Sequence, residues 1–425
     1  MKIDAKPGDY IEVKTSDSAY SGFLMPRSEL DDKDHIVLKL DSGYNVGISL
    51  DRIKSVKKLE KKAKLESFPA QKIAKNPNLP SIDILGCGGT IASRVDYMTG
   101  GVKSAKSPEE IFFTVPELKG IANVRESRLL FNIFSEHMTP KHWQEMAKEV
   151  AKSLNSGARG VVLMHGTDTL HYSSTALSFM LKDLSGPVVF TAAQRSSDRG
   201  SSDAPLNLVC SAHLAAKSDI GEVVICMHGS ESDDFCLAHR GVKARKMHTS
   251  RRDAFQSVNA SPLARITPNG EITKLGDYRK ASGKTTADTR FEEKVALLKA
   301  YPGADAGVID YLVGKKFKGI VIEATGLGHV PKDWEGPIQQ AIKNGVAVVF
   351  AAQTLYGRLN PYGYETARRM REMGVIYAED MLPEVAYVKL GCVLGRGLEP
   401  AKEIPKSWAG ETSERSEERF RPSAE

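Results

Sequence analysis

From Ser81 onward, short apolar runs alternate with amphipathic segments, and this alternation constrains the fold more than any other feature of the chain. The runs have the length and the branched residues of buried strands, and the segments between them carry apolar residues at helical spacing. One segment opens at Thr139 and Pro140, and its apolar face comprises Trp143, Met146, Ala147, Val150, Ala151 and Leu154. The expected strands are 82–86, 160–164, 187–190 and 222–226, and the expected helices are 108–118, 140–154, 170–184 and 206–217. Strands that alternate with helices form a doubly wound parallel sheet, so we expect an α/β core.

The alternation resumes after a less regular stretch near 250–290, which predicts a second and smaller α/β unit with its own core. Its expected strands are 295–298, 319–323 and 346–350, and its expected helices are 304–313 and 337–343. We therefore divide the core into a larger unit, 81–280, and a smaller unit, 290–400. The charged, serine-rich tail, 401–425, is expected to be disordered or to be ordered only by a partner.

Residues 1–58 have a different pattern, with four or five short alternating runs separated by turns. This spacing predicts a small β-barrel of the SH3 or Sm kind, which usually serves as a contact module. Residues 59–80 are rich in lysine and proline, and we interpret them as a linker. The lysine run at 57–62 is either a solvated tether or an RNA contact, and the tether is the simpler interpretation.

Composition narrows the functional classes. The chain has 425 residues and a formal net charge of +6, which permits a partner that carries RNA without demanding one. It contains no run of eighteen apolar residues and no apolar segment at its start, so we expect neither a membrane span nor a secretion signal. The five cysteines are odd in number, lie mostly in apolar runs and form no CxxC pair. This pattern indicates reduced core thiols in a cytoplasmic protein and disfavours a structural zinc site.

Two expected strands end in loops that carry hydroxyl groups. The first loop is Gly86-Cys87-Gly88-Gly89-Thr90, and the second is His165-Gly166-Thr167-Asp168-Thr169. Ligands of parallel sheets bind beyond the carboxyl ends of the strands, so both loops are candidate parts of a site. The first loop lacks the third glycine of a dinucleotide motif, and the chain has no P-loop motif, which disfavours a nucleotide site. Alone, a Thr-Asp pair at a strand end usually forms a turn or a helix cap.

A basic segment at 239–250 is a third candidate part of the site. It is either a patch that binds nucleic acid or the source of a lysine directed into the site. A threonine hydroxyl is a poor nucleophile unless a neighbouring group takes its proton. A lysine can take that proton only where burial or neighbouring groups allow it to be neutral.

Three motifs resemble those of the bacterial-type L-asparaginase family, in the order and the rough spacing of that family. They are Gly88–Ala92, His165–Thr169, and Lys246 followed by Asp253–Asn259. The resemblance covers about residues 80 to 400. It implies the two-unit fold of that family and an amidohydrolase that cleaves a side-chain carboxamide and releases ammonia.

The resemblance also implies catalytic roles, position by position. Thr90 resembles the threonine that is usually assigned as the acylated nucleophile. Thr167 and Asp168 resemble the pair of the second motif, and Lys246 resembles the lysine that completes a Thr-Lys-Asp arrangement. Either threonine is a candidate nucleophile in this family, and the sequence leaves both open.

Substrate-binding roles are implied in the same way. Tyr97 resembles the tyrosine of the mobile flap, and Ser135 with Glu136 resembles the pair that holds the α-carboxylate and α-ammonium of the substrate. Glycine-rich strand ends expose backbone N–H groups that can stabilise an oxyanion. No metal or cofactor is expected in this chain, and we interpret His165 and His171 as local hydrogen-bonding residues.

The β-rich module in front of the core distinguishes this chain from a plain asparaginase. With this module, the chain resembles the glutaminase-type subunits of archaeal tRNA-dependent amidotransferases, as do the segment 323–331 and the charged tail. The resemblance implies a homodimer that hydrolyses glutamine. It also implies a partner, the E subunit of the amidotransferase, which binds Glu-tRNA(Gln), activates its glutamate with ATP and Mg²⁺, and uses the ammonia.

Two alternatives remain. One is a stand-alone cytosolic L-asparaginase with an accessory barrel, and the preference between glutamine and asparagine is left open. The other is an RNA-binding adaptor without enzymatic activity, built on a dead core. The intact Thr90, Thr167, Asp168 and Lys246 argue against the adaptor.

Overall fold

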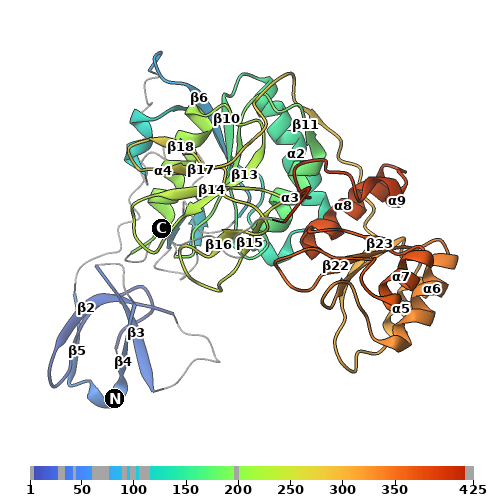
Figure 1. Cartoon of the computed structure of the whole chain (residues 1–425). Helices are drawn as coiled ribbons and strands as arrows, with labels where there is room; N and C mark the ends of the chain where they lie inside the picture. The colour runs from blue at the N-terminus through green and yellow to red at the C-terminus, as the bar shows by residue number, and fades with distance from the viewer. Residues whose placement is uncertain are drawn as a thin grey trace.

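The computed structural model describes residues 4–26, 34–41, 45–59, 76–88, 115–195 and 201–416, together with the backbone of 93–95 and 102–104. Three sheet-containing parts follow one another along the chain (Figure 1). They are a small β domain, a larger α/β unit and a smaller α/β unit. This architecture confirms the predicted α/β core behind a small β module. No helix in the described ranges is long and apolar enough to cross a bilayer.

The N-terminal domain is one five-stranded antiparallel sheet in the order β4-β3-β2-β1-β5. Alternate side chains of its strands, among them Ile11, Val13, Leu38 and Ile48, are buried and form a separate small core. Its elements are β1 (Tyr10–Lys14), β2 (Ala19–Leu24), β3 (His35–Leu40), β4 (Asn45–Ser49), the 3-10 turn η1 (Leu50–Arg52) and β5 (Ser55–Lys58).

The larger unit is built on an eight-stranded sheet in the order β18-β17-β14-β13-β12-β10-β6-β9. Neighbouring strands from β13 to β9 are parallel, and β14, β17 and β18 continue the sheet in antiparallel fashion. The strands are β6 (Ser81–Gly86), β9 (Asn123–Leu129), β10 (Gly160–Met164), β12 (Val188–Thr191), β13 (Val223–His228), β14 (Cys236–Arg240), β17 (Ala264–Ile266) and β18 (Ile272–Lys274).

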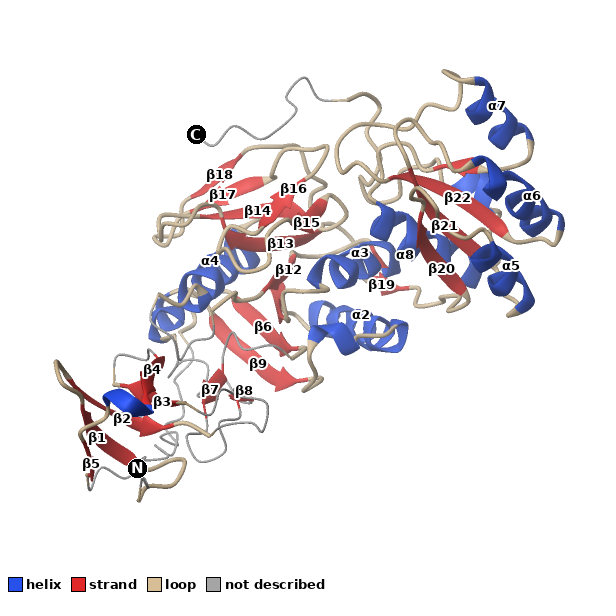
Figure 2. Ribbon diagram, turned by 90° about the horizontal axis from the view of Figure 1, so that it is seen from below, coloured by secondary structure: helices blue, strands red, loops and turns tan. Residues whose placement is uncertain are grey.

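Helices cover both faces of this sheet (Figure 2). Val161 and Leu163 of β10 pack against α2 (Pro140–Asn155) and α3 (Leu170–Met180). Val162, which points to the opposite face, packs in the core that α4 (Ala204–Lys217) covers. The predicted apolar face of α2 is buried as expected.

Short elements complete the larger unit. Two-stranded sheets pair β7 (Ser93–Val95) with β8 (Val102–Ser104), β11 (Leu181–Lys182) with β19 (Thr286–Ala287), and β15 (Ala244–Lys246) with β16 (Phe255–Ser257). The 3-10 turns are η2 (Pro116–Gly120) and η3 (Ser135–His137). The helix expected at 108–118 lies largely outside the described residues. The helix expected at 170–184 ends at Met180, because Leu181 and Lys182 pair with the distant strand β19.

The smaller unit has a four-stranded parallel sheet in the order β20-β21-β22-β23. One face forms a separate core with α5 and α6, as expected for an independent unit. The other face packs against α8, which also contacts α3, so this side shares the core of the larger unit. Its elements are β20 (Val295–Lys299), α5 (Gly307–Gly314), β21 (Gly319–Ala324), η4 (Lys332–Trp334), α6 (Glu335–Lys343), β22 (Ala347–Ala352), α7 (Glu365–Glu372), β23 (Ile376–Tyr377), α8 (Pro383–Gly395) and α9 (Pro400–Glu403).

The C-terminal segment corrects one expectation. Residues 401–416 pack on this chain itself. Glu411 is fully buried, pairs with Lys389 of α8 at 2.7 Å, and accepts hydrogen bonds from the backbone of Trp408 and Ala409. The charged composition was misleading because these charges satisfy one another inside the fold. Residues 417–425 lie outside the described residues.

Candidate active site

The candidate site lies at the carboxyl ends of two neighbouring parallel strands, β6 and β10. Gly86 at the end of β6 is paired with Met164 at the end of β10, so the loops that follow them start side by side. Thr167 and Asp168 lie on the loop after β10, directly before α3. This position agrees with the general location of ligand sites in parallel sheets.

The amine of Lys246 contacts both Thr167 and Asp168. Its Nζ lies 2.9 Å from Oγ1 of Thr167 and 2.7 Å from Oδ1 of Asp168. The lysine side chain is 10% exposed, whereas that of Asp168 is 65% exposed. The structure therefore brings together a hydroxyl, an amine and a carboxylate, as the sequence motifs predicted.

The lysine is presented by the β15–β16 hairpin. Lys246 is the last residue of β15 and is paired with Phe255, whose side chain is fully buried. The hairpin thus anchors the backbone of Lys246 in the core while its amine reaches the edge of the sheet. The family motif that follows Lys246 in sequence, 253–259, contains the partner strand of this hairpin.

Ser135 lies against the same loop from the other side. It is buried in η3, and its carbonyl oxygen accepts a 2.6 Å hydrogen bond from Oγ1 of Thr169. A Cβ on Gly166 would lie only 2.9 Å from Cβ and Oγ of Ser135, so the two backbones approach closely. The neighbouring Glu136 is exposed to solvent. Ser135 is thereby placed against Gly166 and Thr169, which lie on either side of Thr167 and Asp168 in sequence, and Glu136 follows it.

The first motif is only partly described. Gly88 has a φ of +94°, which favours glycine, and a Cβ there would lie 2.0 Å from the carbonyl oxygen of Ile133. This glycine is therefore required by a close approach of two backbones. Thr90 and Tyr97 lie outside the described residues, and their roles remain predictions.

Two histidines near the site are neutral at ordinary pH. Burial lowers the pKa of His165 to about 4, and Nδ1 of this residue lies 2.7 Å from the carbonyl oxygen of Gly166. Burial, helped by the cations of Arg245 and Lys246, lowers the pKa of His171 to about 3. His165 thus makes the local hydrogen bond expected of it. Within the described part of the chain, Nδ1 of His171 has no hydrogen-bond partner.

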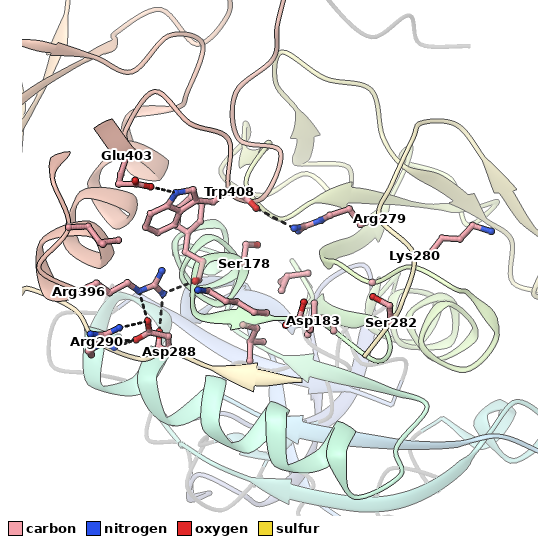
Figure 3. A pocket seen from close by; sticks show the side chains of 17 residues that line it. Ser178, Asp183, Arg279, Lys280, Ser282, Asp288, Arg290, Arg396, Glu403 and Trp408 are labelled. Atoms are coloured by element: carbon pink, nitrogen blue, oxygen red, sulfur yellow. Dashed lines mark hydrogen bonds and ion pairs between the residues drawn. The ribbon is translucent and has the colours of Figure 1, made fainter. Parts of the chain in front are cut away.

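A cavity of about 550 Å³ lies elsewhere, where α3 and β11 meet the end of α8 and the C-terminal segment (Figure 3). The candidate-site residues that the structure describes do not line it. Arg396 at its wall donates to the carbonyl oxygens of Phe179 and Asp288, and Trp408 donates to Glu403. Arg396 and Trp408 therefore make these hydrogen bonds within the chain. The cavity lies at the junction of the larger and the smaller unit.

Comparison with known proteins supplies the family. The Asparaginase, N-terminal model matches residues 81–277, the Glutaminase/Asparaginase C-terminal domain model matches 294–405, and the GatD N-terminal domain model matches 5–59. The D subunit of glutamyl-tRNA(Gln) amidotransferase from Pyrococcus furiosus is 53% identical over 414 residues, covering 95% of this chain and 94% of the relative. This chain belongs to the GatD family of glutamyl-tRNA(Gln) amidotransferase subunits.

Another GatD relative and a solved structure agree. The D subunit of glutamyl-tRNA(Gln) amidotransferase from Methanothermobacter thermautotrophicus is 47% identical, covering 96% of this chain and 94% of the relative. The thermostable L-asparaginase from Thermococcus kodakarensis has a TM-score of 0.71 and 28% identity, over 78% of this chain and 99% of that chain. As a member of the GatD family, the chain is an enzyme of the asparaginase-like amidohydrolase type.

The contacts of this GatD chain also resolve the two interpretations of the basic segment. Arg240 is paired with Glu222 at 2.7 Å, and Lys246 with Asp168. Lys243 is paired with Asp380 at 2.7 Å, and Arg245 with Glu384 at 3.1 Å. These cations are committed to acids of the same chain, which argues against a nucleic-acid patch. Sequence analysis missed these acidic partners of Lys243 and Arg245.

Proposed function

We propose that this chain is a glutaminase that converts glutamine to glutamate and ammonia through a threonine nucleophile. The contact of Lys246 with both Thr167 and Asp168 is the observation that carries this proposal. Lys246 takes the proton of the threonine hydroxyl, and the carboxylate of Asp168 stabilises the ammonium that forms. Thr167 lies in contact with the lysine, and Thr90 remains the alternative nucleophile.

The reaction proceeds in two stages. The threonine oxygen attacks the carboxamide carbon, and backbone N–H groups of the strand-end loops stabilise the oxyanion. The C–N bond then breaks, the leaving nitrogen takes the proton from Lys246, and ammonia departs from an acyl ester. Water hydrolyses the ester by the same proton route, which releases glutamate and restores the hydroxyl. Ser135 and Glu136, with Tyr97 of the flap, hold the α-carboxylate and α-ammonium of the substrate.

The proposal extends to the assembly in which the chain works. We place this chain in a homodimer that associates with the E subunit of the amidotransferase in the cytoplasm. That partner binds Glu-tRNA(Gln), activates it with ATP and Mg²⁺, and uses the ammonia to form Gln-tRNA(Gln). This chain itself needs no cofactor. The relatives match along nearly their whole length, including the N-terminal domain that a plain asparaginase lacks, and this favours the amidotransferase over a stand-alone L-asparaginase.

The test is ammonia release from glutamine and from asparagine by the purified chain, alone and with the E subunit, Glu-tRNA(Gln) and ATP. Glutaminase activity that rises with the full mixture supports the proposal. Fast asparagine hydrolysis by the chain alone, indifferent to the additions, would leave the stand-alone asparaginase. No release under any condition would favour the adaptor.

One substitution tests the catalytic assignment. Lys246→Ala removes the proton acceptor and should lower kcat by about 100-fold or more, the usual contribution of a general base. Lys402→Ala, on the exposed helix α9, is the matched control and should leave kcat unchanged. Equal activity of the two variants would refute the role of Lys246.

A further inference from the structure

The short strand that carries the catalytic lysine is held from the smaller unit. Along a strand, alternate side chains point to opposite sides. Lys243 and Arg245 reach carboxylates of the smaller unit, whereas Lys246 reaches Thr167 and Asp168 of the larger one. Two ion pairs therefore cross between the units at residues that closely precede Lys246.

Of these two ion pairs, the one between Glu384 and Arg245 lies nearer to Lys246 along the chain. It lies in the first turn of α8, its side chain is 3% exposed, and its Oε2 lies 3.1 Å from Nη1 of Arg245. The amino end of a helix favours a negative charge at this point. The other oxygen, Oε1, lies 3.8 Å from Nε2 of His171, in the helix directly after the Thr167 loop. Glu384 thus faces both elements that carry the catalytic groups.

Asp380 makes the second pair, just before α8. Its Oδ2 accepts a 2.7 Å bond from Lys243, and its Oδ1 accepts the backbone N–H of Ser413. Its carbonyl oxygen accepts a bond from Asn259, which follows the hairpin that presents Lys246. Asp380 therefore contacts Lys243 and Asn259, which flank the hairpin, whereas Glu384 contacts Arg245, the residue before Lys246.

We infer that Glu384 is a positioning residue, which acts through Arg245 to hold Lys246 at the distance from Thr167 that proton transfer requires. The inference rests on the proposed role of Lys246. It makes the smaller unit part of the catalytic machinery, because a shift of α8 moves Arg245 and with it the neighbouring lysine. Small displacements of a catalytic group lower the rate of the chemical step more than substrate binding.

Burial decides which substitution tests this role. Lys243 and Asp380 are both almost completely buried, so Asp380→Asn would strand a charge and endanger folding. Arg245 is 34% exposed, and water can solvate it when its partner is neutralised. Glu384→Gln is therefore the informative change, and Arg245→Met tests the same pair from the other side. Burial raises the pKa of Glu384, so this carboxyl can become neutral when Arg245 is absent.

In steady-state glutamine hydrolysis with the full assembly, Glu384→Gln should lower kcat by about 10- to 100-fold. KM should stay within about twofold, because Ser135 and Glu136 are untouched. Glu384→Asp keeps the charge and should recover part of the loss. The double variant with Arg245→Met should be no worse than the poorer single variant, because the two residues act as one unit.

Glu411→Gln is the matched control. It neutralises a carboxylate that is as deeply buried and that pairs with a different cation, Lys389 of α8, and among the described residues its ion pair and hydrogen bonds do not involve Arg245 or Lys246. It should lower Tm and leave kcat unchanged. If Glu384→Gln also lowers only Tm, or changes KM alone, the positioning role is overturned. If Lys246→Ala retains activity, the proposed function fails; if it abolishes activity while Glu384→Gln does not lower kcat, only this inference fails.

Discussion

At the scale of single residues, Gly166 allows the loop that carries Thr167 to lie close to Ser135. An alanine at position 166 would put its Cβ 2.9 Å from the Ser135 side chain. The φ of Gly166 is not in the left-handed region, so the obstacle to alanine is this close contact. Gly166→Ala should therefore displace Ser135 and weaken its proposed contact with the substrate α-carboxylate. We expect KM for glutamine to rise by about 10-fold, equivalent to about 1.4 kcal/mol of binding, with a smaller change in kcat.

The control for this prediction is another glycine-to-alanine change. Gly120 ends the 3-10 turn η2, and a Cβ there would meet nothing within 4 Å. Gly120→Ala should leave both kinetic constants unchanged in the same ammonia-release assay. A normal KM for Gly166→Ala would mean that Ser135 does not bind the substrate.

Much of the described site was predictable because its residues directly follow strand ends in recognisable motifs. Thr167, Asp168 and Lys246 were identified this way, and the structure brings them into contact. Glu384 was missed because 139 residues separate it from Arg245 along the chain. In the sequence it is only an acid after a proline at a helix start, a pattern common to many helices.

At the scale of elements, α8 is the helix on which both units pack, and its glycine Gly391 lies against Phe291. A Cβ on Gly391 would lie 2.2 Å from the ring of Phe291. Gly391→Ala should therefore force the segment before β20 away and lower the free energy of unfolding by about 1–3 kcal/mol, despite the better helix propensity of alanine. Thermal unfolding measures this change directly.

Gly336 in α6 provides the comparison, since a Cβ there would meet nothing within 4 Å. Gly336→Ala should leave Tm unchanged or raise it, because alanine favours the helix. If both variants change Tm alike, the close packing of α8 on Phe291 is not what requires Gly391.

Local periodicity predicted most long elements and failed where distant pairing decides the structure. The buried face of α2 was found from the spacing of its apolar residues. The end of α3 was not, because the pairing of Leu181 with Ala287 overrides the helical pattern after Met180. Helix α8 was also missed. Its sequence is apolar on nearly every side, as expected for a helix buried between two units, so it shows no amphipathic period.

At the scale of the whole molecule, stability should decrease in mild acid because histidines are buried without charge. Burial lowers the pKa of His165 to about 4, of His171 to about 3 and of His239 to about 4, from 6.5. Below pH 6.5 the unfolded chain binds protons that the folded chain excludes, so the free energy of unfolding falls as pH falls. Each histidine contributes at most about 1.4 kcal/mol per pH unit.

Urea denaturation between pH 7.5 and pH 5 measures this loss, in a window above the ordinary pKa of aspartates. Glu384, whose pKa is raised by burial, works in the opposite sense, so the net slope should be below the sum of the histidine terms. Replacing buried His239 by Gln should reduce the slope, whereas His137→Gln, at an exposed position, should preserve it. A stability that stays constant from pH 7 to pH 5 in the unsubstituted protein would contradict neutral burial. His165 and His171 lie on either side of Thr167 in sequence, after β10 and in α3, so their protonation would also loosen the Thr167 loop.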